Sequence, residues 1–237
     1  MGQALQRDTM TKRVVRRSIC AKFAASALGP IISGCEIFAL SKGQYSTIDV
    51  IEHCLRSTGP ADILAATWNC APNDGRFLAN LADAGLIRSI RFILDHSFQV
   101  REPASIAFLV ERFGAESIRT TVNHAKFIVI RNADWNVCIR TSANLNENLR
   151  MELFEVSDCA AMASFLNDYA DEVFRLHGAH ESRAKSEAMF KSGDLFGERL
   201  DSESQGRRIE GISVESRKYL GTGRYDTDVR RAGVARA

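Results

Sequence analysis

From residue 35 onward, short apolar runs alternate with stretches whose apolar positions recur at helical spacing. Each apolar run is bounded by glycine, proline or polar turn residues, which is the pattern of buried strands. The strands that this pattern predicts are residues 35–41, 61–68, 89–95, 117–122, 125–130 and 136–140. The helices that it predicts are residues 46–57, 76–84, 103–113 and 160–176, with ends set by capping residues, glycine and proline.

The order of these elements predicts the fold class. Strands that alternate with helices favour a largely parallel sheet with helices on both faces. Residues 125–130 and 136–140 flank the polar segment RNADWN and predict a hairpin, which makes the sheet mixed. We therefore expect an α/β domain with a mixed, mostly parallel sheet flanked by helices. In such sheets the functional groups gather at the strand ends.

The pattern also divides the chain into three regions. Residues 35–177 hold the predicted domain, and residues 178–237 are rich in small and charged residues, which predicts a mostly disordered, flexible tail. Residues 1–34 place basic side chains before an apolar run, but Lys22 interrupts that run and Pro30 closes it, so the likeness to a signal peptide is weak. We expect a basic N-terminal helix or arm, which either contacts an acidic partner or forms a solvated face.

Composition adds limited information. The formal net charge is +2, so total charge does not indicate a nucleic-acid binder. No apolar stretch reaches the roughly 18 residues that a membrane-spanning helix needs, so we expect no membrane span. The six cysteines are scattered without a CxxC pair. This spacing favours buried free thiols in a cytoplasmic protein over a disulfide framework or a metal site.

The strongest chemical signal is the stretch TTVNHAKFIVIRNADWNVCIRTSANLNEN, residues 120–148. His124 and Lys126 are two residues apart, so on a strand their side chains leave the same face. Hydroxyl and amide donors follow the predicted hairpin at Thr141, Ser142, Asn144 and Asn146. A helix that starts after them would add backbone N–H groups. Imidazole, ammonium and neutral donors around one point describe a phosphate site, and imidazole can be a nucleophile toward phosphorus.

These residues resemble the signature of the phospholipase D superfamily: His-x-Lys, four residues, Asp, six residues, then Gly-Ser or Gly-Gly followed by Asn. His124 and Lys126 match its first two positions. The segment from Ser142 to Leu145 matches the familiar GSANL segment, with Thr141 in place of Gly. Asp134 becomes the counterpart of the motif Asp if the hairpin loop is three residues longer, since six residues then separate it from Thr141. The order of strands and helices also resembles one phospholipase D-like half.

The resemblance implies a mechanism that uses neither metal nor cofactor. In the family, the motif His attacks phosphorus to form a phosphohistidine, the Lys and Asn stabilise the phosphoryl oxygens, and a second motif His protonates the leaving oxygen. This sequence carries one motif, because His53 and His96 lack the partner Lys. The resemblance therefore implies a homodimer in which two copies of His124 face each other.

The residues expected at the site form three groups. Catalysis is expected from His124, Lys126 and Asp134. Phosphate binding is expected from Lys126, Ser142 and Asn144, and support from Thr141, Glu152 and Glu155, since the glutamates resemble an acidic residue often found after the motif. Structural alternatives remain open: turn chemistry for Asn144 and Asp134, and a helix cap for Ser142. Trp68, Asn69, Asp95 and His96 end predicted strands and either line the cleft or serve the core.

Three functions fit these features. The first is a metal-independent phosphodiesterase that cleaves nucleic acid, DNA or RNA, which the basic N-terminal segment and the Arg-containing tail favour. The second is a catalytically impaired nucleic-acid-binding or scaffold protein, which Thr141 and the displaced Asp134 favour. The third is reaction on a small phosphodiester or headgroup, for which the sequence offers no marker.

Overall fold

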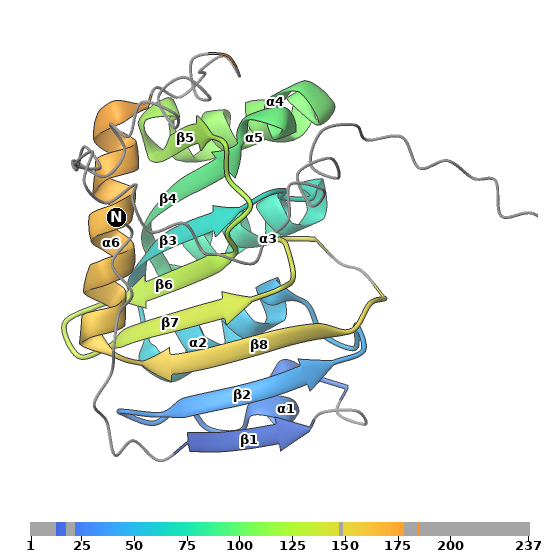
Figure 1. Cartoon of the computed structure of the whole chain (residues 1–237), viewed down its shortest axis with the longest axis vertical. Helices are drawn as coiled ribbons and strands as arrows, with labels where there is room; N and C mark the ends of the chain where they lie inside the picture. Colours follow the sequence, from blue (N-terminus) through green and yellow to red (C-terminus); the bar gives the residue numbers. More distant parts are fainter. Residues whose placement is uncertain (1–12, 18–21, 147–148, 178–183, 185–237) are drawn as a thin grey trace, which may run out of the picture. The chain divides into compact units, whose positions relative to one another are not determined.

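The structure is a computed structural model that describes residues 13–17, 22–146, 149–177 and 184. These residues form an eight-stranded sheet of order β1-β2-β8-β7-β6-β3-β4-β5 (Figure 1). Its strands are β1 (Arg13–Arg17), β2 (Glu36–Ser41), β3 (Ala61–Thr67), β4 (Ile87–Asp95), β5 (Ile118–Thr121), β6 (Phe127–Arg131), β7 (Asn136–Thr141) and β8 (Glu152–Asp158). The helices are α1 (Ala24–Leu28), α2 (Thr47–Thr58), α3 (Pro72–Asp83), α4 (His96–Arg101), α5 (Pro103–Phe113), the 3-10 turn η1 (Ala115–Ser117) and α6 (Ala160–Leu176).

Strand direction determines where functional groups can meet. β3, β4 and β5 are parallel neighbours, and β1 is parallel to β2. β6 and β8 run antiparallel to both of their neighbours. Six of these eight strands therefore point the same way, and β6 and β8 return in the middle of the sheet. The predicted fold class, a mixed and mostly parallel sheet flanked by helices, is confirmed.

Helices cover both faces of the sheet. One face carries the larger apolar core, to which α2, α3 and α5 contribute Leu55, Leu78 and Leu109. α6 crosses the strands on the opposite face (Figure 1), where Leu166 packs in a second apolar cluster with Val129 of β6. Because both faces are covered, β3, β4 and β5 are buried along most of their length, and polar groups concentrate at the strand ends.

Most predicted elements are confirmed within a few residues. The helices predicted at 103–113 and 160–176 are α5 and α6, with the predicted bounds. The helix predicted at 46–57 is α2, and Ser46 is its N-cap: its hydroxyl accepts the Asp49 N–H, and the Asp49 carboxylate accepts the Ser46 N–H at 2.6 Å. α3 begins at Pro72, earlier than predicted, because proline is well tolerated in the first turn of a helix.

Other segments differ from the prediction. Arg13–Arg17 form edge strand β1, where the sequence suggested a basic helix or arm. α4 and β8 are not among the predicted elements. A strand, β8, lies where a helix start was expected after Ser142 and Asn144. Phe154 and Val156 of β8 are buried and Leu153 is exposed, which suits a strand paired with both β2 and β7.

The structure bears on the expectations about free thiols, membrane spans and the C-terminal tail. Cys35, Cys54, Cys70 and Cys138 are buried free thiols, and burial raises the pKa of Cys54 and Cys70. Within the described part of the chain, no helix combines the length and apolar character that crossing a membrane requires. The predicted tail, residues 178–237, lies outside the described residues except for Ala184.

Candidate active site

The chain direction brings most of the predicted site residues to one end of the sheet. β3, β4, β5 and β7 end there, and β6 and β8 begin there. His124 and Lys126 lie between β5 and β6, and Ser142 follows β7. The Thr141 N–H donates to the Lys126 carbonyl at 3.2 Å, and Glu152 is the first residue of β8. We refer to this end, where His124 and Lys126 lie, as the catalytic end.

His124 and Lys126 contact each other directly. The Lys126 Nζ lies 3.4 Å from the His124 Nδ1 and donates to the His124 carbonyl oxygen at 2.9 Å. Both residues precede β6, so the expectation that they lie on the strand itself is wrong. The reason is local: the Ala125 N–H donates to the Asn123 side-chain oxygen at 3.1 Å instead of a neighbouring strand. His124 is exposed and Lys126 is half-buried.

Lys126 is electrostatically unusual. Its pKa lies below the ordinary lysine value, chiefly because burial of the ammonium group disfavours the charged form. The carboxylate of Glu152 acts in the opposite direction and raises this pKa. Burial leaves the Lys126 ammonium partly dehydrated beside the His124 imidazole. A phosphoryl oxygen bound there would interact strongly with this ammonium group.

Thr141 and Ser142 form the turn that leads out of β7. The Thr141 hydroxyl donates to the Leu153 carbonyl at 2.8 Å and accepts the Ala143 N–H at 2.9 Å. Ser142 is exposed, and its hydroxyl donates to the Glu152 carboxylate and accepts the Leu153 N–H. Thr141 has a negative φ angle, so this backbone position does not require glycine. The Gly-to-Thr difference from the family pattern therefore adds hydrogen bonds without backbone strain.

Asn144 is held by neighbouring elements. Its carbonyl oxygen accepts the Thr47 hydroxyl at 3.0 Å, and its side-chain oxygen lies 3.5 Å from the Thr67 hydroxyl. The adjoining Leu145 is buried and its N–H donates to the Asn69 carbonyl at 3.2 Å. The side-chain oxygens of Asn69 and Asn146 are buried without a hydrogen-bond partner among the described residues. The segment after β7 is therefore fastened to the end of β3.

Asp95 and Asn123, a residue for which the sequence pattern predicts no role, hold the His124 segment. Asn123 is buried, and its amide donates to the carbonyls of Thr67, Ile93 and Ala125 at 3.1, 3.3 and 3.3 Å. The Asp95 carboxylate accepts the Asn123 N–H at 3.2 Å. An asparagine directly before the motif His, which follows a predicted strand, is the signal that could have indicated this role.

Trp68 extends the site at the end of β3. Its ring centroid lies 6.2 Å from that of His124, and the Arg101 guanidinium carbon lies 3.9 Å from the centroid of the Trp68 ring. Trp68 is half-buried and Arg101 is exposed. Of the two interpretations of Trp68, these contacts favour a place at the cleft, because the ring contacts both a cation and the candidate nucleophile.

A cavity of about 410 Å³ opens beside Lys126. Its polar wall is formed by Lys126, Arg140, Thr141, Ser142 and Glu155, and its apolar wall includes Phe127, Leu153 and Leu166. Glu155 forms an ion pair with Arg140, its cross-strand neighbour. Glu155 therefore lies close to the site but neutralises Arg140, whereas Glu152 acts on Lys126.

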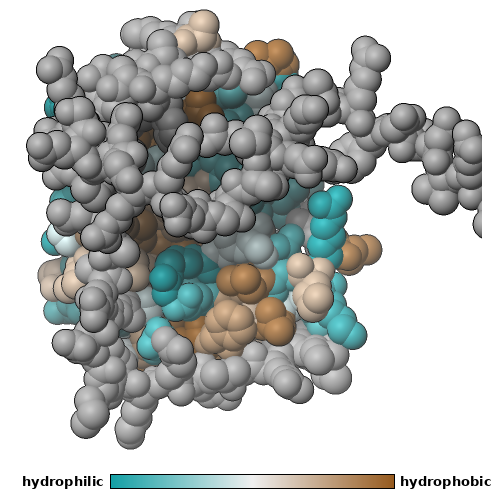
Figure 2. Space-filling view, in the orientation of Figure 1, coloured by the Kyte–Doolittle hydropathy of each residue, from teal (hydrophilic) through white to brown (hydrophobic). Residues whose placement is uncertain are grey.

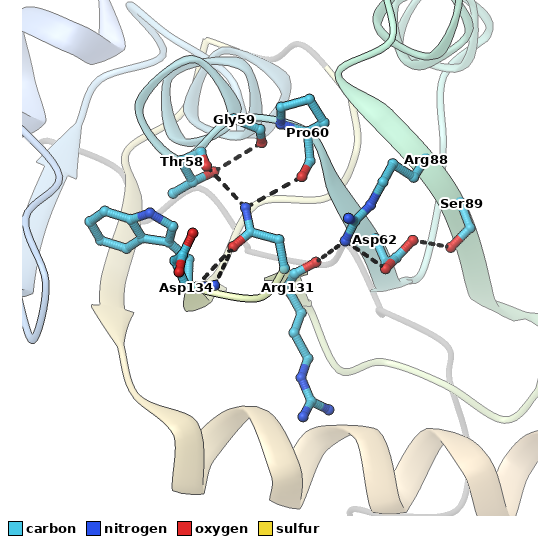
Figure 3. Close-up of polar contacts among 10 residues, drawn as sticks. Thr58, Gly59, Pro60, Asp62, Arg88, Ser89, Arg131 and Asp134 are labelled. Carbon is cyan, nitrogen blue, oxygen red and sulfur yellow. Dashed lines mark hydrogen bonds and ion pairs between the residues drawn. The ribbon is translucent and has the colours of Figure 1, made fainter.

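Asp134 does not join these residues within one chain. It lies on the turn between β6 and β7, where its N–H donates to the Asn132 side-chain oxygen at 3.0 Å (Figure 3). β6 is five residues long, and at about 3.3 Å per residue it separates Lys126 from that turn by roughly 13 Å or more. The expectation that Asp134 acts beside Lys126 is therefore corrected: the gap that aligned it with the motif places it at the opposite end of the strand.

We expected no metal ion at the site around His124 and Lys126. Among the described residues, no three His, Cys, Asp or Glu side chains are grouped so that they could hold a metal ion. His53 and His177 lie in other contacts, with the Gly29 carbonyl and the Thr121 hydroxyl.

No family model and no curated protein matches the chain. Among solved structures, the chain is similar to Nuc, a phospholipase D family member from Salmonella typhimurium, with 13% identity, a TM-score of 0.43, and coverage of 60% of this chain and 95% of that chain. It is also similar to NucT from Helicobacter pylori, with 14% identity, a TM-score of 0.42, and coverage of 60% and 98%. Polyphosphate kinase from Porphyromonas gingivalis gives 13% identity, a TM-score of 0.44, and coverage of 58% and 26%.

Proposed function

We propose that this protein is a metal-independent phosphodiesterase that cleaves nucleic acid through a phosphohistidine at His124. The observation that carries the proposal is the exposed His124 imidazole in contact with the partly buried Lys126 ammonium at the catalytic end. A nucleophile and a phosphate-binding cation are thereby adjacent, and Ser142 offers a hydroxyl on the neighbouring turn.

The proposed reaction has two steps. An imidazole nitrogen of His124 donates its electron pair to phosphorus, a P–N bond forms, and the P–O bond to the leaving group breaks. Because Nδ1 faces Lys126, Nε2 is the ring nitrogen that we assign as nucleophile. The leaving oxygen takes a proton from an acid, and water then cleaves the P–N bond to regenerate His124. Lys126 binds the non-bridging oxygens throughout, so its charge stabilises the transition state.

A second copy of His124 would supply the acid in a homodimer. Next to the site, in and before β8, Leu149, Met151 and Leu153 expose 89%, 72% and 38% of their surface. Figure 2 shows hydrophobic side chains beside hydrophilic ones on the face that carries β8. An exposed apolar group of this kind beside the catalytic end suits a contact between two copies.

The dimer can be tested independently of catalysis. Met151→Asp places a charge in the proposed contact, and we expect sedimentation velocity to show a monomer with strongly reduced cleavage. Val100→Asp, at another exposed apolar position on α4, is the matched control and should remain dimeric. A monomeric wild type with full activity would contradict the dimer but leave His124 as nucleophile open to its own test.

The decisive experiment measures cleavage of single- and double-stranded DNA and RNA in EDTA. We expect cleavage by the wild type, none by His124→Ala, and a His124 peptide joined to a nucleotide through a P–N bond in mass spectra of quenched wild-type reactions. Equal cleavage by both proteins would contradict the proposal.

One alternative is favoured by specific contacts. Asn144 is engaged by Thr67, and Asp134 lies at the far end of β6, so two motif positions are not arranged for turnover. A nucleic-acid-binding or scaffold protein with impaired catalysis would show binding by both wild type and His124→Ala, no cleavage by either, and a marked salt dependence of affinity.

A further inference from the structure

A second cavity lies at the opposite end of the sheet, on the face that α6 crosses. It has a volume of about 370 Å³ and is formed by the beginnings of β3 and β4, the end of β6, and Asn167 of α6. Five residue steps along β3 separate Asp62 in this cavity from Thr67 at the catalytic end, which is about 16 Å. We call it the arginine cavity, because Arg88, Arg91 and Arg131 line it.

The three arginines of the arginine cavity differ in their contacts with the described residues. Arg88 donates to the Asp62 carboxylate at 2.9 Å, and Arg91 donates to Asp171 at 2.5 Å and to Asn167 at 3.1 Å. The Arg131 guanidinium has no hydrogen-bond or ion-pair partner among the described residues, and in Figure 3 its side chain extends away from the Arg88–Asp62 pair.

The acidic group in the wall is already neutralised. Asp62 is the one carboxylate among the residues that line the arginine cavity, and its two oxygens accept the Ser89 hydroxyl at 2.8 Å and the Arg88 guanidinium. Asp62 is therefore poorly placed to recruit a cation. Arg88 is paired with Asp62 and Arg91 with Asp171, so the Arg131 guanidinium carries the uncompensated charge in the lining and the cavity favours an anion.

The backbone that carries Arg131 is held in place. The neighbouring Asn132 donates to the carbonyls of Thr58 and Pro60 at 2.9 and 3.3 Å, and its side-chain oxygen accepts two N–H groups of the turn (Figure 3). Arg88 also donates to the Arg131 carbonyl at 3.4 Å. A fixed backbone reduces the entropy that ordering of the Arg131 side chain costs on binding.

We propose that the arginine cavity binds a phosphate group, with Arg131 as its principal ligand and Arg88 as a second donor. Guanidinium groups match phosphate geometry through paired N–H donors. The volume is within the range of small-ligand pockets, and Leu64 and Val129 provide an apolar wall for the remainder of the ligand. The phosphate can belong to a free nucleotide or to the end of a nucleic-acid strand. This proposal does not depend on the reaction at His124.

The test is a titration of the full chain followed by nuclear magnetic resonance of backbone amide and arginine side-chain N–H groups. The probes are inorganic phosphate, a nucleoside 5′-monophosphate, and a short oligonucleotide with and without a 5′-phosphate. We expect saturable shifts at Ser89 and Arg131 that remain in His124→Ala. Arg131→Ala should weaken binding at this cavity by about tenfold or more, the loss typical of one charge-assisted hydrogen-bonded pair. Arg56→Ala, which removes an exposed arginine of α2 that pairs with Glu52, is the charge-matched control.

The outcomes separate the sources of the phosphate. Tighter binding of the mononucleotide indicates a free nucleotide, and tighter binding of the 5′-phosphorylated oligonucleotide indicates a nucleic-acid end. Shifts that never saturate, shifts abolished by His124→Ala, or equal losses in Arg131→Ala and Arg56→Ala would each overturn the proposal. A circular dichroism melt of Arg131→Ala shows whether the variant is folded, and Arg131→Lys, which keeps the charge without the paired donors, should bind with intermediate affinity.

Discussion

At the catalytic end, Lys126 lies against an exposed imidazole and interacts with Glu152, whereas at the other end three arginines line a cavity that holds no histidine. We propose phosphate as the ligand at both ends, but the two ends differ in what they can do with it. The catalytic end combines a cation with the proposed nucleophile His124 and is therefore the end to which we assign bond cleavage. The arginine cavity offers donors alone and therefore suits binding. A cluster of cations therefore indicates that an anion can bind. A nucleophile beside those cations is needed to indicate a reaction.

The largest expected effect comes from the nucleophile. We expect His124→Ala to lower kcat/KM for cleavage of nucleic acid by at least about 10³-fold, as loss of a nucleophile generally does. Because His124 is exposed, the free energy of unfolding should change by less than about 0.5 kcal/mol. His53→Gln, a substitution at a histidine of α2, is the control for kinetics. A wild-type kcat in His124→Ala would show that His124 is not the nucleophile. The catalytic end and the arginine cavity would then no longer differ in function.

The next effect concerns the residue that positions His124. Asn123 is buried and joins three carbonyl groups, so Asn123→Ala should lower the free energy of unfolding by about 1–3 kcal/mol. Displacement of His124 should lower kcat by roughly 10²-fold with a small change in KM.

Asn132 provides a matched control, since its amide joins the Thr58 and Pro60 carbonyls at the other end of the sheet. Asn132→Ala should destabilise the fold by a similar amount and reduce kcat much less. Equal losses of kcat in both variants would show that Asn123 acts through stability alone.

Some elements of the fold could be predicted from the sequence, and others could not. Apolar runs predicted most strands of the sheet. The helix at 103–113 has its predicted ends because Pro103 and Gly114 mark them directly, and the helix at 160–176 was predicted from apolar residues at helical spacing. β8 was missed because only Phe154 and Val156 mark its buried face, and its place between β2 and β7 is a property of the whole sheet.

The sequence predicts those residues of the candidate site that lie on either side of one hairpin. His124, Lys126 and Ser142 come to the same end because β6 and β7 form the predicted hairpin. Asp134 was matched to the motif by spacing alone, although the predicted hairpin turn RNADWN already places it at the other end of the strand from Lys126. The contacts of Trp68 with Arg101 and His124 join three separate segments, so no pattern within any one of them predicts the cluster.

A smaller effect concerns pH. The Glu152 carboxylate raises the pKa of Lys126, so Glu152→Gln should lower that pKa further. Cleavage needs the ammonium form and is lost as pH rises through this pKa, so the alkaline limb of the pH–rate profile should move to lower pH in the variant. Glutamine keeps an oxygen that can accept the Ser142 hydroxyl. In Glu155→Gln, where the lost charge pairs with Arg140, the alkaline limb should stay in place. A shift to higher pH in Glu152→Gln would contradict the assignment of Lys126.

The smallest expected effect is a gain at the arginine cavity. Asp62→Asn removes the carboxylate from the cavity wall and frees Arg88 from its ion pair, so phosphate affinity should rise by roughly two- to tenfold. Stability should change little, because both partners of this pair are about half exposed. Added salt should reduce the gain, since exposed charges are screened. Unchanged or weaker phosphate binding in Asp62→Asn would mean that Arg131 and Arg88 do not act on a common anion, and the arginine cavity would then be a solvated gap between α6 and the sheet.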